Sequence, residues 1–391
     1  MPDSESPKST QASRPVGAAR PAGADGSAVR FERLIRTLTV LALLYLFFLG
    51  LDLMGLSFKL FGKGFAERLL TGTSDPFVGL IVGILATSLV QSSSTTTSMT
   101  VALVAAGAIS LEGAIPIIMG ANIGTSVTNT LVSLGHVTRR EEFRRAFAGA
   151  TVHDFFNLLT VAILFPLELA TGYLARTANA VEGLLEGSGG LKLFDPVKAA
   201  VRPVAETISE TLGSSGWLTL LAGIALLFLA LRFLVGVLKT LLTARAEQLL
   251  DRTLLRSPLA AIGAGCAITA MVQSSSITTS VMVPLVAAGI VSLEQLFPLT
   301  IGANLGTTVT AMLAALSTGN AAAISVALSH VLFNVSGAAV LYPIPLVRRI
   351  PLTLARALGS LASRHRWLAL LYVALVFFGI PLTMLALAGR F

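Results

Sequence analysis

The chain is poor in charged residues and almost free of cysteine. Only 12% of its 391 residues are Asp, Glu, Lys or Arg, which is about half the share found in soluble globular domains. The single cysteine, Cys266, excludes an intramolecular disulfide. Hydrophobic residues make up 54% of the chain. This combination predicts a multi-pass protein of the cell membrane.

The N-terminus lacks a cleavable signal pattern. Residues 1–30 are rich in Ser, Pro, Gly and Arg, so we expect a disordered tail. The net charge is +8, but Lys and Arg lie beside apolar runs, where they set membrane orientation. No nucleic-acid recognition motif accompanies them. We therefore expect no nucleic-acid partner.

Several apolar runs are long enough to span a bilayer without interruption. They cover residues 37–57, 150–170, 217–238, 322–343 and 367–388. Two further regions, 76–135 and 258–317, are apolar but are repeatedly broken by Gly, Pro, Ser, Thr and Asn. Each broken region is too long for a single span.

The two broken regions are copies of each other. Aligned without a gap, 76–130 and 258–312 are identical at about half of their positions. The motif Gln91–Ser94 returns 182 residues later as Gln273–Ser276. Such self-similarity indicates an internal duplication.

Each copy is expected to form a re-entrant hairpin, 76–109 or 258–291, followed by a broken transmembrane helix. We place the turn of the first hairpin at Gln91–Thr97. The interruption of the following helix is expected at Gly120–Thr125, where glycines permit unwinding. The second copy is expected to repeat both features, with its helix interrupted at Gly302–Thr307.

The distribution of Lys and Arg differs between the copies. Arg30, Arg33 and Arg36 precede the first span, which predicts a cytoplasmic N-terminus. A strongly basic run, 139–145, follows the first broken region, whereas the corresponding loop at 317–320 has no charge. Positive charges at opposite ends of equivalent elements predict inverted repeats.

The predicted fold is therefore an all-α polytopic membrane protein with two inverted repeats, each with a re-entrant helical hairpin and a broken transmembrane helix. The expected division is a tail at 1–30, repeat 1 at 31–170, an outside linker at 171–216, repeat 2 at 217–346, and a cytoplasmic connection with a final transmembrane helix at 347–391.

Each hairpin carries an amide and a run of hydroxyls in apolar surroundings. Polar side chains at membrane depth are costly unless they face a cavity or a ligand. Neutral donors suit a tetrahedral oxyanion such as phosphate, although small hydroxyl residues can also serve only to pack helices closely. The candidate phosphate ligands are Gln91, Ser92, Ser93, Ser94, Gln273, Ser274, Ser275 and Ser276.

Neither hydroxyl cluster contains Lys or Arg, so the charge of a bound anion calls for a cation bound beside it. Oxygens of hydroxyl, amide and exposed carbonyl groups suit Na⁺. Asp154 adds a carboxylate where the second copy has Val331, although a carboxylate near the start of a span can also reach the interface. The candidate Na⁺ ligands are Thr95, Thr96, Asn122, Thr125, Asp154, Asn157, Thr278, Asn304, Thr307 and Asn334.

These motifs together resemble the type II sodium-dependent phosphate cotransporter family, in the bacterial form without an appended soluble domain. The resemblance rests on both Gln-Ser-Ser-Ser motifs, both Gly-Ala-Asn-x-Gly-Thr motifs, the run 143–157 and Pro166–Glu168, and it covers roughly 31–388. It implies that phosphate binds between the two hairpin tips with Na⁺ ions nearby. It also implies that Asp154 is the acidic site associated with electrogenic coupling.

The function expected from this resemblance is sodium-driven symport of inorganic phosphate into the cell by alternating access. Its partners would be phosphate, Na⁺ and the lipid bilayer, with no cofactor beyond Na⁺ as the coupling ion. The residues leave open another anion, sulfate or a carboxylate, and an anion channel. A homodimer is also left open. A serine enzyme is not expected, because the chain has no Gly-x-Ser-x-Gly elbow and no P-loop.

Overall fold

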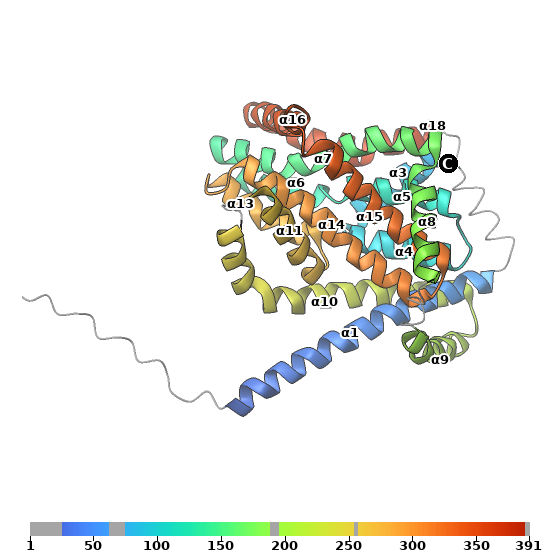
Figure 1. Cartoon of the computed structure of the whole chain (residues 1–391). Helices are drawn as coiled ribbons and strands as arrows, with labels where there is room; N and C mark the ends of the chain where they lie inside the picture. The colour runs from blue at the N-terminus through green and yellow to red at the C-terminus, as the bar shows by residue number, and fades with distance from the viewer. Residues whose placement is uncertain (1–25, 62–74, 188–194, 254–256, 388–391) are drawn as a thin grey trace, which may run out of the picture. The chain divides into compact units, whose positions relative to one another are not determined.

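The computed structural model describes residues 26–61, 75–187, 195–253 and 257–387, and the regular elements in these ranges are all helices (Figure 1). Most of the tail predicted at 1–30 lies outside the described residues, and its last residues, from Gly26, already belong to the first helix. The chain divides into two compact units, residues 1–41 and 42–391. The described part of the first unit is the N-terminal part of helix α1, and the other elements belong to the second unit.

The described helices cover most of the described residues. In chain order they are α1 (Gly26–Phe61), α3 (Pro76–Val90), α4 (Ser93–Ala105), α5 (Leu111–Gly124), α6 (Val127–Ser133), η1 (Leu134–His136), α7 (Arg140–Thr171), α8 (Tyr173–Gly187), α9 (Asp195–Thr211), α10 (Gly216–Thr253), α11 (Pro258–Val272), α12 (Ser275–Ser280), α13 (Met282–Ala287), α14 (Leu293–Thr318), α15 (Ala321–Leu341), α16 (Pro345–Arg364), α17 (Trp367–Ala374), η3 (Leu375–Gly379) and α18 (Ile380–Leu387).

Seven segments of the described chain are long and apolar enough to cross a membrane. They are Leu34–Phe61, Leu111–His136, Arg140–Thr171, Gly216–Leu234, Leu293–Thr318, Ala321–Leu341 and Trp367–Leu387. This confirms the expected all-α polytopic membrane protein and each of the five uninterrupted spans. The opposite orientation of the two repeats stays a prediction.

The hairpin arms are too short to cross a bilayer. Helices α3 and α11 each have 15 residues, or about 22 Å at 1.5 Å per residue, against about 30 Å of hydrocarbon. Each begins with a proline at its first turn and ends at a glutamine in the left-handed conformation, with φ of 55° at Gln91 and 58° at Gln273. The chain then reverses, as expected for a re-entrant hairpin.

The turn of the first hairpin is much shorter than the predicted Gln91–Thr97. Helix α4 already starts at Ser93, because the Ser92 side chain accepts a hydrogen bond from the backbone N–H of Thr95. Hydroxyl residues then continue the helix. For example, Thr100 Oγ1 donates to the carbonyl oxygen of Thr96 at 2.9 Å, which satisfies the hydroxyl without a turn.

The interruption predicted in both following helices occurs only in the first copy. There α5 ends at Gly124 and α6 starts at Val127. In the second copy the prediction is wrong, because α14 runs without a break through Gly302–Thr307. The glycines of the motif therefore do not unwind the helix in that copy.

These glycines instead let two helix backbones touch. A Cβ atom at Gly120 would lie 2.0 Å from the carbonyl oxygen of Leu80, and one at Gly302 would lie 2.0 Å from that of Ile262. The first arm of each hairpin consequently packs directly on the helix that follows it, α3 on α5 and α11 on α14 (Figure 1). Close approach through small residues is the usual way that helices associate in a bilayer.

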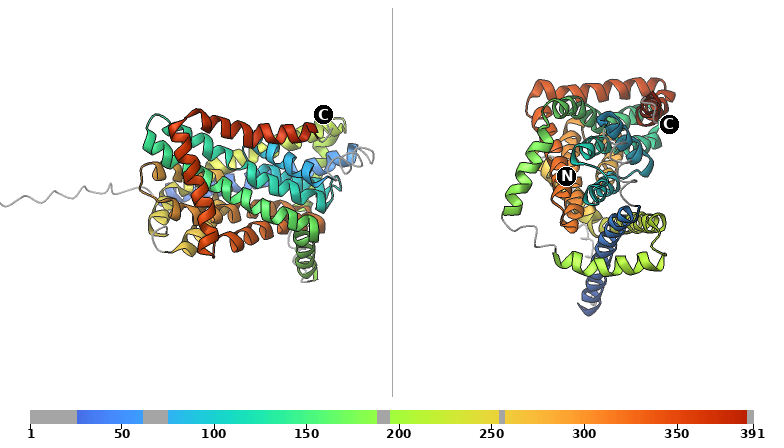
Figure 2. Two further views of the ribbon diagram at one scale, coloured as in Figure 1. Left: turned by 90° about the horizontal axis from the view of Figure 1, so that it is seen from above. Right: turned by 90° about the vertical axis from the view of Figure 1, so that its right-hand side faces the viewer.

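The described part of the predicted linker at 171–216 contains the helices α8 and α9. Gly172, with φ of 62°, ends α7, and the carboxylate of Glu168 accepts hydrogen bonds from the backbone N–H groups of Leu174 and Ala175 at the start of α8. Helix α8, green in Figure 2, lies beside α15. Its position as an outside linker stays a prediction.

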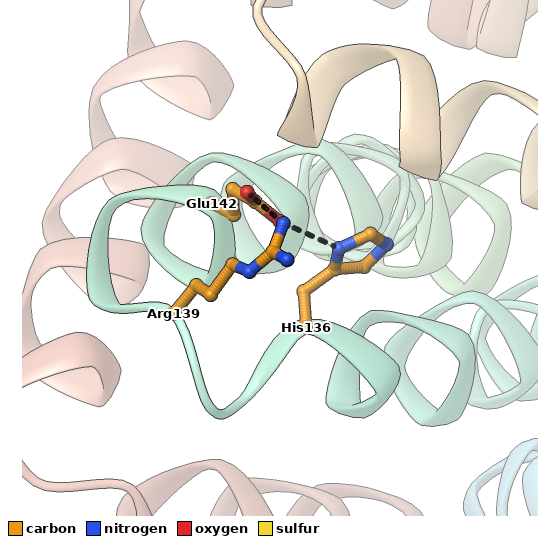
Figure 3. A network of polar contacts seen from close by, with 3 residues as sticks. All are labelled: His136, Arg139 and Glu142. Carbon is orange, nitrogen blue, oxygen red and sulfur yellow. Dashed lines mark hydrogen bonds and ion pairs between the residues drawn. The ribbon is translucent and has the colours of Figure 1, made fainter.

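The turn before α7 carries a surface network of polar contacts. Arg139 Nη1 donates to Glu142 Oε1 at 2.8 Å, and the other carboxylate oxygen lies 3.5 Å from His136 Nδ1 (Figure 3). Such exposed pairs contribute little stability. The buried rings of Phe143 and Phe147, with centroids 5.5 Å apart, anchor the start of α7 instead.

A glycine pair on α11 tests the backbone contact. In Gly265→Ala, the new Cβ would lie 2.2 Å from the carbonyl oxygen of Leu299, whereas Gly263 faces open space. We expect Gly265→Ala to lower the free energy of unfolding by about 3 kcal/mol through overpacking. Gly263→Ala should be neutral or raise it by up to about 1 kcal/mol. Thermal unfolding of both variants in detergent measures the difference, and equal midpoints would contradict the close packing.

Candidate functional site

The two hairpin tips meet. Ser94 Oγ, at the start of α4, donates to the backbone carbonyl oxygen of Gln273 at 3.0 Å. Ser276 Oγ lies 3.4 Å from the carbonyl oxygen of Thr125, at the point where the first-copy helix breaks. Residues about 180 positions apart in sequence are thus in direct contact. The two duplicated motifs therefore lie together in the fold.

A cavity of about 390 Å³ lies at this junction. The predicted phosphate ligands that line it are Gln91, Ser92, Ser94, Gln273, Ser274 and Ser276. Thr95, Thr128 and Ser280 add hydroxyl groups to its wall. The other two predicted ligands, Ser93 and Ser275, are buried in the first turns of their helices and do not line it.

The cavity also has a charged wall that the sequence analysis missed. Arg232 of α10 lines it, together with the apolar side chains of Phe228 and Leu231. Arg232 is exposed and makes no hydrogen bond or ion pair with any residue that the structure describes. A single arginine within the apolar run 217–238 was a usable signal, because ionisable residues inside membrane spans usually mark a functional site.

Several predicted Na⁺ ligands join one buried network across the two copies. Asn304 Nδ2 donates to Asn157 Oδ1 at 2.6 Å, and Asn157 Nδ2 donates to the carbonyl oxygen of Asn122 at 2.7 Å. Asn304 Oδ1 lies 2.6 Å from His153 Nε2. These four side chains are at most 4% exposed. The network links α14 of the second copy to α5 and α7 of the first.

Asp154 is fully enclosed by protein, at 1% exposure. Its Oδ2 accepts hydrogen bonds from Tyr372 at 3.0 Å and from Thr130 at 3.4 Å. Its Oδ1 is buried and has no partner among the described residues. The sequence pattern indicated the carboxylate but not Tyr372, which reaches it from α17 at the far end of the chain.

Asn129 is a third residue that was not predicted from the sequence. Its side-chain amide bonds to Thr279 at 2.8 Å and accepts from Ser280 at 2.8 Å, and it lies 3.4 Å from His153 Nδ1. The equivalent position in the second copy is Ala311. Asn129 therefore ties the first-copy helix to the second hairpin with no symmetric counterpart.

Other predicted Na⁺ ligands are buried but bond within their own hairpin or helix. Thr96 pairs with Thr87 at 2.9 Å, and Thr278 pairs with Thr269 at the same distance. The remaining ones, with carbonyl partners on their own helices, are Thr125, Thr307 and Asn334. Within the described ranges, no cluster of three or more His, Cys, Asp or Glu could hold a metal ion. Any cation here would rely on neutral oxygens and Asp154.

The sequence matches a known family model and several curated proteins. The model described as Na⁺/Pi-cotransporter matches residues 46–182 and 226–384. Sodium-dependent phosphate transport protein 2B of Homo sapiens is 35% identical, over 92% of this chain and 66% of that protein. Protein 2A of Ovis aries is 37% identical, over 89% of this chain and 67% of its own length. The chain thus spans about two thirds of these relatives. No solved structure matches it.

Two asparagines at corresponding positions test the buried network. Asn157 makes two hydrogen bonds to other helices, whereas among the described residues Asn334 bonds only to the carbonyl oxygen of His330 on its own helix. We expect Asn157→Ala to lower the free energy of unfolding by about 2 kcal/mol more than Asn334→Ala, since it leaves buried partners unpaired. Thermal unfolding in Na⁺-free buffer makes the comparison. Equal losses would mean that the network contributes no stability.

Proposed function

The chain belongs to the Na⁺/Pi-cotransporter family, and we propose that it moves inorganic phosphate into the cell by sodium-driven symport. The observation that carries this proposal is the contact between Ser94 and Gln273, which joins both duplicated motifs around one cavity. The family is one of transporters, not enzymes.

Phosphate binds in the cavity between the hairpin tips in this proposal. The lining amides and hydroxyls supply many neutral donors, and the N-terminus of α4 adds its partial positive charge. Arg232 supplies a full positive charge to the cavity wall. Holding the anion therefore depends less on Na⁺ than it would if the cavity had only neutral donors. Ser93 and Ser275 then shape the helix starts rather than contact the anion.

Na⁺ binds, in the same proposal, near the buried polar groups behind the cavity. Asp154 is the leading ligand, since its Oδ1 is buried without a partner while Tyr372 and Thr130 hold its other oxygen. Asn and Thr oxygens of the neighbouring network complete a site of the kind that hard monovalent cations use in transporters. Burial of a carboxylate without a cationic partner is costly, and Na⁺ offsets that cost.

Transport proceeds by alternating access in this proposal, with the two repeats inverted and the N-terminus in the cytoplasm. The support is the repeated pairing of a hairpin arm with the next helix, α3 with α5 and α11 with α14. Because the cavity lies between the two hairpins, relative movement of the repeats would open it to one side or the other.

Uptake of radiolabelled phosphate into proteoliposomes tests the proposal. An inward Na⁺ gradient should drive accumulation above the outside concentration, and an equal K⁺ gradient should not. Unlabelled sulfate and succinate should compete poorly.

Two outcomes would contradict it. Equal phosphate entry without a Na⁺ gradient would indicate a channel, and entry of sulfate or succinate instead of phosphate would indicate a symporter for another anion.

Replacement of Arg232 tests the charge in the cavity wall. Arg232→Gln should raise the KM for phosphate roughly tenfold, equivalent to about 1.4 kcal/mol, because the anion loses its one cationic contact there. Arg232→Lys keeps the charge and should retain most of the affinity. The Na⁺ dependence of uptake and the unfolding midpoint serve as controls. An unchanged phosphate KM in Arg232→Gln would mean that this side chain reaches the interface and not the substrate.

A further inference from the structure

A second cavity, of about 280 Å³, lies apart from the hairpin tips and is rich in arginine. Arg144 and Arg145 line it from the start of α7, and Arg356 lines it from α16. The opposite wall is the connection from α13 to α14, including Gly289 and Ser292. None of these residues belongs to the phosphate or Na⁺ site described above.

The positive charge of this arginine pocket is only partly compensated. Arg144 pairs with Glu141 at 2.9 Å, and Arg356 pairs with Glu294. Arg145 has no hydrogen-bonded or ionic partner in the described chain, and its Nε is buried. Three guanidinium groups thus face two carboxylates, which leaves a net charge of +1 centred on Arg145.

The duplication provides an internal control for what these arginines do. In the first copy, Gly107, Ser110 and Glu112 correspond to Gly289, Ser292 and Glu294 of the second. Both connections fold alike, with φ of 72° and 77° at the glycines and a serine capping the next helix.

Of these two glycines, only Gly289 has an arginine directly against it in the described structure. A Cβ atom built on Gly289 would lie 2.9 Å from Arg145 Nη1, whereas one built on Gly107 would face open space. Gly107 therefore takes the same conformation without an arginine beside it, so Arg145 is not needed to hold Gly289 in that conformation.

The pocket lies near the N-terminal end of α7, a helix that is longer than the hydrocarbon layer is thick. Helix α7 has 32 residues and is about 48 Å long, so at least one of its ends must project beyond a hydrocarbon layer of about 30 Å. Arg144 and Arg145 are in its second turn. Helix α16 packs along α7. Its Leu352 and Ala355 are buried, whereas Arg349 and Arg356 are exposed. Such a division into an apolar and a charged face is typical of amphipathic helices at the membrane interface.

The walls of the pocket match one kind of ligand. Guanidinium groups bind phosphate oxygens through paired, charge-assisted hydrogen bonds. Beside them the pocket is lined by apolar Ala148, Val286, Val291 and Leu293. Basic pockets between transmembrane helices with apolar flanks are typical sites for anionic lipid headgroups.

We propose that the arginine pocket binds a phosphate group, carried by an anionic phospholipid headgroup or present as free phosphate. Arg145 is its principal contact, and Arg144 and Arg356 share the charge with their carboxylate partners. This proposal does not depend on transport, because binding is measured on the purified protein.

Thermal unfolding of the full chain in detergent micelles provides the test. The midpoint is titrated with phosphatidylglycerol, with phosphatidylcholine, and separately with inorganic phosphate. The variants are Arg145→Gln and Arg356→Gln, with Arg349→Gln as the matched control, since Arg349 is an exposed arginine of α16 outside the pocket. If Arg145→Gln does not fold, Arg356→Gln decides, because its side chain is half-exposed.

With a lipid ligand, phosphatidylglycerol but not phosphatidylcholine raises the midpoint of the wild type and of Arg349→Gln. Its half-saturating concentration then increases about tenfold in the two pocket variants, as expected for the loss of one charge-assisted hydrogen bond. A response to inorganic phosphate that only the pocket variants lose identifies the free anion as the source. If the pocket variants titrate like Arg349→Gln with both compounds, the proposal is wrong.

Discussion

The direct contact of helix backbones at paired glycines is the constraint on which the rest of the structure depends. Gly83 and Gly120 bring α3 against α5, and Gly265 and Gly302 bring α11 against α14. A hairpin arm that does not cross the bilayer has no other partner of comparable extent. This contact therefore fixes the depth of each hairpin tip, and with it the meeting of Ser94 and Gln273.

The charge in the site comes from elements outside the hairpins. The duplicated motifs supply neutral donors, whereas Arg232 of α10 places its guanidinium group in the cavity wall. Tyr372 of α17 donates a hydrogen bond to the buried carboxylate of Asp154. Asn129 adds a third contact that the duplication does not repeat. The specific chemistry of the site thus depends on residues in which the two copies, or their surroundings, differ.

Much of the fold could be predicted from the sequence, because runs of about 20 apolar residues have few alternatives to a spanning helix. The turn predicted at Gln91–Thr97 was too long because hydroxyls such as Thr100 can bond to carbonyls of their own helix. The break predicted in α14 was wrong because its glycines serve packing. Tyr372 was missed because only tertiary packing brings α17 to Asp154. Arg232 did have a sequence signal, its position inside an apolar run, but only the fold shows which cavity it lines.

The corresponding buried histidines of the two copies differ in how well their ring nitrogens are satisfied. Both ring nitrogens of His153 lie near asparagines, whereas neither nitrogen of His330 has a partner in the described protein, nor does Asn334 Oδ1. Each such atom costs about 1–3 kcal/mol. In the described protein, His330 therefore carries a free-energy cost that its counterpart His153 does not, although the two copies are identical at about half of their aligned positions.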